Sequence, residues 1–456
     1  MERKRNGVCM LYRVFSLLVS VPLLAIPARS EDTWPRFLNV QFDGVSDSTA
    51  QIDWTKKPTL AWSIDAGEGY GIGSVADGRY LHFDSGPTEN PSMVIERIRS
   101  VDMDDGSLQW VHKQPIVYRD LYGYEDGPRS SATVEGDQVF TLGVSGILTC
   151  RDLATGKQRW AVSTSTVYGV VQNFFGVGSS PLVLDDQVIV MVGGSPPEDQ
   201  RIPPGRLDRV VPNGSALVSF DKATGKERWR AGDDLASYSS PRTIQLGDET
   251  LVLCYARDGL LAVDPSNGDV RWKFSHRAEI LESVNAIVPV VKDDLVFVSE
   301  CYGVGSALLK VTGQAANVVW RDPPRDRRRQ AMRCHWSTPV FVDGYLYGCS
   351  GRNAPDSDFR CIAFDNGEVQ WSDPRRVRSS VTKVGDHLVL LEERGAIQII
   401  RPNPEKLEVI AEWNLSMPET GRPPIVYPCW AAPIVVGDKL MVRGDERVLC
   451  LQLQTQ

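Results

Sequence analysis

Short apolar runs joined by acidic or glycine turns follow one another along almost the whole chain. In residues 181–192, two β-branched runs flank the pair Asp185-Asp186. Residues 132–142, 339–347 and 433–442 repeat this arrangement around a Gly-Asp or Asp-Gly pair. Such pairs suit tight turns because Gly and Asp tolerate positive φ at low cost. The pattern predicts a succession of β-hairpins with little helix.

A tryptophan follows each hairpin at a nearly fixed place. Residues 152–160 (Asp-Leu-Ala-Thr-Gly-Lys-Gln-Arg-Trp) and 221–229 (Asp-Lys-Ala-Thr-Gly-Lys-Glu-Arg-Trp) are two close copies of one motif. A third strand ends at the Asp, and the Trp lies on a fourth. The intervals between successive tryptophans run from 42 residues (Trp371 to Trp413) to 69 (Trp160 to Trp229). Repeats of this length with four antiparallel strands are typical of β-propeller blades.

Seven complete four-strand units fit between Gly71 and Trp413. An eighth unit, residues 432–453, has three strands but lacks the tryptophan strand, whereas residues 59–64 have that strand alone. We therefore predict an all-β fold, an eight-bladed β-propeller of four-stranded antiparallel blades. The ring is expected to close through pairing of the N-terminal strand with the C-terminal blade, which leaves no open sheet edge at the joint.

The recurring tryptophans are expected to dock adjacent blades, because a large aromatic at one fixed place per repeat serves the repeated interface. The eight positions are Trp62, Trp110, Trp160, Trp229, Trp272, Trp320, Trp371 and Trp413.

The N-terminus has the features of an export signal. Arg3, Lys4 and Arg5 precede an apolar run over residues 14–26 and small residues at 28–30. The run is short for a bilayer span, and no other segment is a better candidate. Cys9 lies ahead of the apolar run, which argues against a lipid anchor at the cleavage site. We expect a signal peptide (1–30), an N-terminal extension (31–57) and one propeller domain (58–456), exported to the periplasm or secreted.

The Asp-x-x-Thr-Gly-Lys-x-x-Trp repeat, with Ser-Ser-Pro hairpins at Ser179 and Ser239, resembles the pyrroloquinoline quinone (PQQ) repeat family of eight-bladed propellers. That family includes quinoprotein dehydrogenases and the propeller lipoprotein of the outer-membrane β-barrel assembly machine. Longer strings, such as residues 344–352 and 427–433, are similar to a bacterial cell-envelope subfamily of PQQ-like propellers. The resemblance specifies the fold far better than the function, because one fold carries many activities.

Charge limits the range of partners. The formal net charge is −8, and removal of residues 1–30, with five basic and one acidic residue, leaves −12. An acidic surface disfavours nucleic acid and anionic membranes. The basic run at residues 325–329 is the exception, and we interpret it as a solvated loop.

Eight cysteines follow the signal peptide, an even number that permits disulfides in an oxidising compartment. Cys349 and Cys361 flank one loop between neighbouring strands and are the best candidate pair. The alternative is buried free thiols, which are common on strands. The sequence has no Cys-x-x-Cys and only scattered histidines, so no metal site is expected.

Candidate binding residues gather on the loop-rich face. The long connections, residues 85–93, 118–129, 193–214 and 350–358, belong on one face of the ring, where binding is usually found. Residues just before each innermost strand should rim the channel there, and three residues at the ends of second strands should approach it. The first group is Tyr118, Tyr122, Tyr124, Arg129, Asn173, Phe174, Tyr238, Glu282, Asn285, His335, Trp336, Arg378, Tyr427 and Trp430, and the second is Glu300, Tyr302 and Arg352. Two roles are open for these side chains. They bind a ligand or a partner, or they plug the central channel and clamp neighbouring blades together.

Three functions remain open at this point. The first is an exported non-catalytic scaffold that binds a protein or envelope polymer through this face, with no catalytic residue, cofactor or nucleic-acid partner. The second, implied by the resemblance, is a PQQ- and Ca²⁺-dependent dehydrogenase. Such enzymes hold the quinone against a disulfide of adjacent cysteines, which this sequence lacks. Glu282, Asn285 and Glu300 could supply oxygen ligands to Ca²⁺. The third is a carbohydrate-binding or -processing propeller.

Overall fold

The computed structural model of this chain describes residues 1–2, 33–90, 93–374, 376–415 and 424–456. Apart from its first two residues, the predicted signal peptide lies outside the described residues, and residues 32–456 separate from it as a unit of their own. No helix among the described residues has the length and apolar character needed to cross a membrane.

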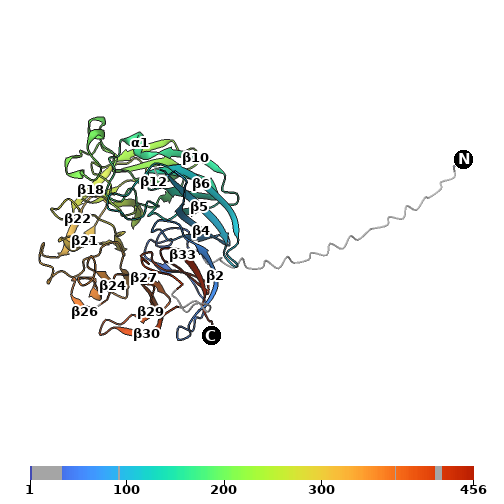
Figure 1. The fold of residues 1–456 in the computed structure, drawn as a ribbon. Helices are drawn as coiled ribbons and strands as arrows, with labels where there is room; N and C mark the ends of the chain where they lie inside the picture. Colours follow the sequence, from blue (N-terminus) through green and yellow to red (C-terminus); the bar gives the residue numbers. More distant parts are fainter. Residues whose placement is uncertain (3–32, 91–92, 375, 416–423) are drawn as a thin grey trace. The chain divides into compact units, whose positions relative to one another are not determined.

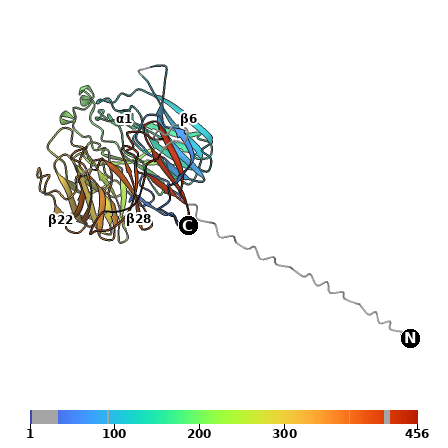
Figure 2. The same ribbon diagram turned by 60° about the horizontal axis from the view of Figure 1, so that its bottom comes forward.

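The predicted eight-bladed propeller is confirmed. Residues 59–452 form eight antiparallel four-stranded blades in a ring (Figures 1 and 2). The first four blades are β3(Ser74–Ala76)–β4(Arg79–Gly86)–β5(Val94–Asp102)–β6(Leu108–Ile116), β7(Thr133–Glu135)–β8(Gln138–Leu142)–β9(Ile147–Asp152)–β10(Gln158–Ser163), β11(Leu182–Leu184)–β12(Gln187–Met191)–β13(Leu217–Asp221)–β14(Glu227–Ala231), and β15(Arg242–Leu246)–β16(Glu249–Tyr255)–β17(Gly259–Val263)–β18(Val270–Ser275).

The second half of the ring repeats the plan. Blades five to seven are β19(Val290–Lys292)–β20(Leu295–Glu300)–β21(Gly305–Val311)–β22(Ala316–Arg321), β23(Val340–Val342)–β24(Tyr345–Ser350)–β25(Asp358–Ala363)–β26(Val369–Asp373), and β27(Ser379–Val384)–β28(His387–Glu392)–β29(Ile397–Arg401)–β30(Glu408–Trp413). Blade eight combines β31(Ile434–Val436), β32(Lys439–Arg443) and β33(Arg447–Gln452) with β2(Thr59–Asp65). β2 is antiparallel to β33, with Thr59 opposite Gln452 and Asp65 opposite Arg447.

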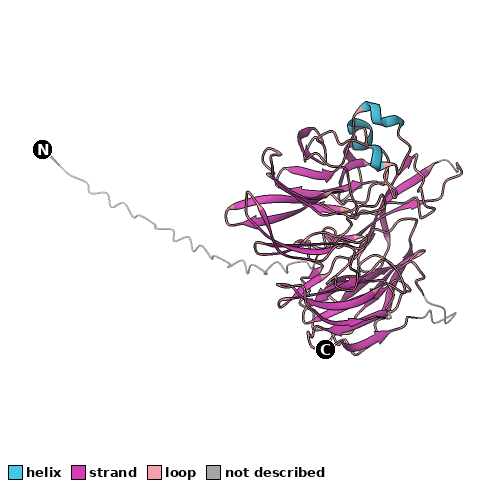
Figure 3. Cartoon of the chain, turned by 90° about the vertical axis from the view of Figure 1, so that its left-hand side faces the viewer, coloured by secondary structure: helices cyan, strands magenta, loops and turns pink. Residues whose placement is uncertain are grey.

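Among the residues that the structure describes, helix is confined to the long connections of blades two and three. A short helix, α1 (Thr164–Tyr168), follows β10, and two 3-10 turns, η1 (Pro197–Arg201) and η2 (Leu207–Arg209), lie in the connection after β12. Figure 3 shows these helical turns gathered in one part of the molecule. They cover the start of blade three on the loop-rich face.

The tryptophans reach from one blade to the next. Seven of them donate an indole N–H hydrogen bond to a backbone carbonyl in the turn that follows the third strand of the next blade. The pairs are Trp62 with Met103 (3.0 Å), Trp110 with Leu153 (2.9 Å), Trp160 with Lys222 (2.9 Å), Trp229 with Pro265 (2.9 Å), Trp272 with Thr312 (3.0 Å), Trp320 with Phe364 (2.9 Å) and Trp371 with Asn403 (2.8 Å).

The glycine of the repeated turn completes this contact. Gly225 has φ +70°, and a Cβ there would lie 2.7 Å from the ring of Trp160 in the preceding blade. Gly156 stands in the same relation to Trp110, at 2.5 Å. Only glycine accepts both the left-handed backbone and the approaching ring. The motif therefore couples the turn of one blade to the tryptophan of its neighbour.

Trp413 is the exception in the series. Its indole nitrogen is buried without a hydrogen-bond partner among the described residues. Its ring instead stacks on Trp54 of the N-terminal segment, with centroids 6.2 Å apart and an interplanar angle of 18°.

Residues 34–48, part of the predicted extension, run across the ring against the innermost strands. Trp34 forms a two-way backbone bridge with Val75 of blade one, and Pro35 accepts from Val134 of blade two. The Arg242 guanidinium of blade four donates to the carbonyls of Gln41 and Phe42.

The same segment then reaches blades seven and eight. A two-residue strand, β1 (Val45–Ser46), is parallel to β27 and adds a fifth strand to blade seven. The Ser46 hydroxyl donates to Val435 in blade eight at 2.7 Å. The segment thus ties together blades that are distant around the ring.

The predicted disulfide is wrong. The eight cysteines of the described chain are buried free thiols. In the β24–β25 register, Cys361 lies opposite Tyr347 and Cys349 lies opposite Phe359. The two cysteines are therefore diagonal neighbours, about 7–8 Å apart, whereas a disulfide requires Cα atoms within roughly 4.4–6.8 Å.

Trp62→Ala should destabilise the protein as much as Trp229→Ala. Both indoles are buried, at 6% and 8% exposure, and each donates to the next blade. We expect a loss of roughly 3–5 kcal/mol for each, typical of a buried Trp, measured by denaturant unfolding. A much smaller loss for Trp62→Ala would show that β2 contributes little to the ring.

Trp110→Phe should cost more than Trp413→Phe. The first change leaves the buried Leu153 carbonyl without its hydrogen-bond donor, which lowers the free energy of unfolding by roughly 1–3 kcal/mol. The second breaks no hydrogen bond and keeps an aromatic ring against Trp54. The difference in unfolding free energy between the two variants measures the indole–carbonyl bond, and equal losses would remove that bond from the account of blade docking.

Candidate functional site

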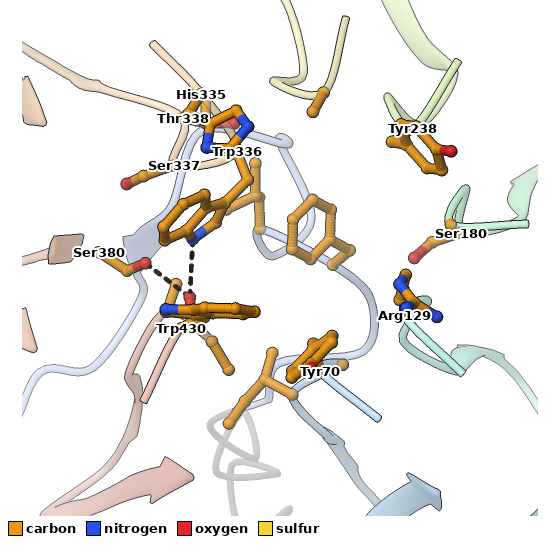
Figure 4. Close-up of a pocket in the computed structure, with 18 of the residues that line it drawn as sticks. Tyr70, Arg129, Ser180, Tyr238, His335, Trp336, Ser337, Thr338, Ser380 and Trp430 are labelled. Atoms are coloured by element: carbon orange, nitrogen blue, oxygen red, sulfur yellow. Dashed lines mark hydrogen bonds between the residues drawn. The ribbon is translucent and has the colours of Figure 1, made fainter. Parts of the chain in front are cut away.

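Residues that precede the innermost strands enclose a cavity of about 200 Å³ on the loop-rich face (Figure 4). We call it the aromatic cup. All eight blades contribute residues to it, and Phe37 and Leu38 of the N-terminal segment also line it. The side chains that carry its character are Phe37, Tyr70, Tyr124, Phe175, Tyr238, Trp336 and Trp430, with Arg129 and Arg378.

Backbone and hydroxyl groups fix the wall of the cup from blade to blade. The Ser180 hydroxyl accepts from the Ser131 N–H at 2.9 Å, and the Ser240 hydroxyl accepts from the Ser180 N–H at 2.9 Å. On the other side, the Ser380 hydroxyl donates to the Trp430 carbonyl at 2.8 Å. The Ser-Ser-Pro hairpins of the sequence therefore hold the rim residues in place.

The aromatic rings contact one another around the cup. Trp430 lies 4.7 Å from Tyr70, 5.3 Å from Trp336 and 6.0 Å from Tyr124 between ring centroids. Phe175 lies 5.5 Å from both Tyr124 and Tyr238. Such tilted and edge-on pairs stabilise one another and give the cup a largely apolar surface.

Arg129 is paired and stacked at the same time. Its guanidinium donates to Asp120 at 2.9 Å, and the Asp120 side chain is fully buried. The guanidinium carbon lies 5.3 Å from the Tyr70 ring centroid and 5.7 Å from that of Phe175. The charge is therefore balanced within the protein, while the flat faces of the neighbouring rings hold the group in position.

Arg378 repeats this arrangement on the opposite side. Its guanidinium bonds Glu393 at 2.7 Å and lies 4.6 Å from the Trp336 ring and 4.9 Å from the Trp430 ring. The Trp430 indole donates to the same Glu393 carboxylate at 3.2 Å, and the Trp336 indole donates to the Trp430 carbonyl at 3.2 Å. The polar atoms on this side are thus bonded within the cup wall.

His335 is uncharged. Burial, with the nearby positive charges of Arg378 and Arg352, lowers the pKa of His335 to about 3. Its Nε2 lies 3.1 Å from the Tyr302 hydroxyl, and its Nδ1 is buried without a partner among the described residues. A neutral imidazole with one open nitrogen can exchange a single hydrogen bond with a bound group.

Seven of the residues expected at the rim line the cup. They are Tyr124, Arg129, Tyr238, His335, Trp336, Arg378 and Trp430. Four others border it. Tyr122 packs on Phe174 and Phe175, Tyr427 on Trp430, Tyr302 on His335, and Arg352 lies over the Tyr302 ring at 5.1 Å. Tyr118 and Asn173 line a different cavity.

None of the three residues considered as Ca²⁺ ligands lines the cup. The Asn285 side chain is fully buried, and its amide nitrogen donates to the carbonyls of Ala256, Arg257 and His276. Its oxygen has no hydrogen-bond partner among the described residues. The Glu300 carboxylate accepts from the Ser283 hydroxyl at 2.7 Å and from the Tyr302 N–H at 2.9 Å. Glu282 is exposed. The described residues contain no group of three or more His, Cys, Asp or Glu side chains arranged to hold a metal ion.

Tyr70, Phe175, Phe37 and Leu38 are among the lining residues that were not anticipated. Tyr70 and Phe175 lie four and seven residues before an innermost strand, so the rule that found the other rim residues could have been extended to them. Phe37 and Leu38 belong to a segment without a repeat. No periodic signal in the sequence places that segment inside the ring.

The comparisons with known proteins agree with the fold. The family model described as "Outer membrane protein assembly factor BamB", a PQQ-repeat model, matches residues 94–320. No curated protein matches the chain significantly. BamB from Moraxella catarrhalis is a similar solved structure, with 16% identity, a TM-score of 0.57, and coverage of 88% of this chain and 99% of its own.

Quinoprotein enzymes are structural neighbours as well. A europium-containing methanol dehydrogenase shares 13% identity at a TM-score of 0.61, covering 90% of this chain and 89% of its own. The quinohemoprotein alcohol dehydrogenase ADHIIG from Pseudomonas putida HK5 shares 12% identity at 0.61, covering 93% and 81%. The resemblance to PQQ-repeat propellers, including BamB and the quinoprotein dehydrogenases, is thereby confirmed. At these identities the similarity establishes the fold alone.

Glu125 lies beside the cup at the joint between blades one, two and eight. Its carboxylate accepts from the Gly69 N–H, and its own N–H donates to the Tyr70 hydroxyl at 3.3 Å. Burial, together with a hydrogen bond to the Asp445 side chain, raises the pKa of Glu125 to about 8, although the nearby Arg443 opposes the shift. The carboxyl group is therefore protonated in the folded protein at neutral pH.

Glu125→Gln should stabilise the protein at alkaline pH. Because the pKa is raised on folding, the protonated carboxyl group stabilises the fold fully below about pH 4.5, and that contribution is lost as the pH rises through about 8. The neutral amide has no such loss. The melting temperature of Glu125→Gln relative to wild type should increase from pH 5 to pH 9, and a constant difference would contradict the assigned protonation state.

Proposed function

We propose that this protein is an exported, non-catalytic binding or assembly scaffold of the bacterial cell envelope. The aromatic cup and its rim are the proposed contact surface. The partner is a protein or an envelope polymer that inserts an apolar or ring-shaped group into the cup. The export signal in the sequence and the match to the BamB family model support this assignment.

One observation carries the proposal. Both guanidinium groups that line the cup are already paired with carboxylates, Arg129 with Asp120 and Arg378 with Glu393. The cup therefore offers aromatic surface and little free charge. An aromatic pocket with its polar groups satisfied is suited to anchoring one uncharged group of a larger partner, as at the centre of many protein interfaces.

PQQ fits this cup poorly. It is a planar quinone with several carboxylate groups, and buried carboxylates need paired cations. Arg129 and Arg378 are already balanced by Asp120 and Glu393, so a ligand carboxylate placed beside either arginine would leave a net negative charge in that cluster. The donor set for Ca²⁺ is equally unsuited, since Asn285 and Glu300 do not line the cup and the Glu300 carboxylate is bonded within the protein.

The exposed aromatic residues of the rim are the proposed first contacts with the partner. Tyr124 and Tyr427 are 47% and 51% exposed, and both contact Trp430 inside the cup. Exposed aromatics around an aromatic pocket suit a protein anchor, and their flat faces also suit the sugar rings of a polymer. A sugar polymer as partner corresponds to the carbohydrate-binding function considered from the sequence.

A photo-crosslinking residue at position 124 should capture a specific envelope partner in living cells. The same residue at position 108, on the outer strand of blade one and 58% exposed in wild type, provides the matched control. We expect one dominant crosslinked species at position 124, identified by mass spectrometry, and none shared with position 108. Tyr427→Ala should weaken that capture about tenfold, the loss of a contact worth about 1.4 kcal/mol.

Purified envelope glycan provides the other arm of the experiment. Co-sedimentation with the glycan that is lost in Tyr427→Ala and kept in Leu108→Ala would assign the cup to a polymer. The scaffold proposal would be contradicted if positions 124 and 108 gave the same crosslinked species and if Tyr427→Ala changed neither crosslinking nor co-sedimentation.

A further inference from the structure

A second cavity of about 170 Å³ lies behind the wall of the aromatic cup, between the loop-rich ends of blades two and three. The segment 173–180 separates the two cavities. Val177 and Ser179 line the second cavity, whereas Gly178 and Ser180 line the cup. We call this second space the inter-blade cavity. Its roof includes Ser165 of α1 and Leu207 of η2.

Most of the inter-blade cavity is apolar. Val144, Met191, Val192, Leu207 and Leu235 line it, and each is less than one-tenth exposed. Among the described residues that line it, none carries a formal charge. An ion placed here would lose its hydration without gaining a counter-charge, so the cavity selects against charged ligands.

Three buried hydroxyl groups in the lining, those of Tyr118, Ser145 and Ser179, have no hydrogen-bond partner among the described residues. Ser179 is only 1% exposed. The segments that carry the two serines are joined by the Val177 N–H, which donates to Val144 at 2.9 Å. Buried polar groups are normally hydrogen-bonded, and these hydroxyl groups would gain a partner from a group placed in the cavity.

Two other polar side chains in the lining already have hydrogen-bond partners. The Asn173 amide donates to Ala236 at 3.3 Å, and its oxygen accepts from the Phe174 N–H. The Ser237 hydroxyl donates to the Tyr255 carbonyl. The open hydrogen-bonding capacity therefore includes Ser145, Ser179 and Tyr118, and the hydroxyl group of a ligand, as donor and acceptor, can bond the two serines.

The volume of the cavity limits the size of the ligand. An apolar cavity of about 150 Å³ holds one benzene molecule, and the inter-blade cavity is slightly larger. We propose that it is a binding site for a small uncharged single-ring molecule that carries a hydroxyl group, with the ring against the valine and leucine side chains and the hydroxyl group toward Ser145 and Ser179. This proposal does not depend on the function proposed for the cup.

Phenol is the probe, with toluene and benzoate as matched ligands, and titration calorimetry of the purified full chain measures binding. We expect one phenol per chain. Toluene should bind about five- to tenfold more weakly than phenol, because it leaves the Ser145 and Ser179 hydroxyl groups without a hydrogen bond. Benzoate should bind on the order of a hundredfold more weakly, or not at all, because its carboxylate would be buried without a counter-ion.

Variants locate the site. Ser179→Ala should weaken phenol binding about fivefold and leave toluene binding unchanged, whereas Ser85→Ala should affect neither. Ser85 is a matched control because its hydroxyl is also buried and unpartnered among the described residues but does not line the cavity. Val171→Phe should fill the cavity and abolish phenol binding. If that variant does not fold, Ser145→Leu is the substitute.

Three results would overturn the proposal. The first is an absence of saturable phenol binding, which would mean that the cavity holds water alone. The second is benzoate binding as strong as that of phenol. The third is phenol binding that survives both Ser179→Ala and the filling variant, which would place phenol elsewhere, such as in the aromatic cup.

Discussion

The contact between a tryptophan and the turn of the next blade is the interaction on which this structure depends. It joins an indole N–H to a backbone carbonyl and a ring to a glycine, and it recurs around the ring. Because each blade touches only its neighbours, a ring of such contacts sets the position of every innermost strand. The residues just before those strands are thereby held close enough to share one cavity.

The N-terminal segment changes what that ring can do. It crosses the innermost strands of five blades and brings Phe37 and Leu38 into the lining of the aromatic cup. The cup is consequently a largely apolar hollow on the loop-rich face, with its two arginines balanced by Asp120 and Glu393. The same fold in a quinoprotein has to accommodate an anionic cofactor, and the paired arginines here work against that use.

The repeating features were predictable from the sequence because they follow a period. The tryptophans and the glycine turns recur along the repeat, and seven of the cup residues were found because they lie shortly before an innermost strand. Phe37 was missed because its segment occurs once and its path is fixed by tertiary contacts such as that with Arg242. Asn285 and Glu300 were expected at the rim, but neither lines the cup: the Asn285 amide nitrogen and the Glu300 carboxylate form hydrogen bonds within the protein instead. The cysteine pairing depended on a strand register that spacing cannot supply.

A titration of the purified protein with PQQ in the presence of Ca²⁺ tests most directly whether the cup serves as a scaffold site. The absorbance of the quinone reports binding, and dye-linked alcohol oxidation reports catalysis. We expect no saturable quinone binding and no Ca²⁺-dependent oxidation, because both arginines that line the cup are already paired with carboxylates. Stoichiometric PQQ binding accompanied by alcohol oxidation would contradict the scaffold function.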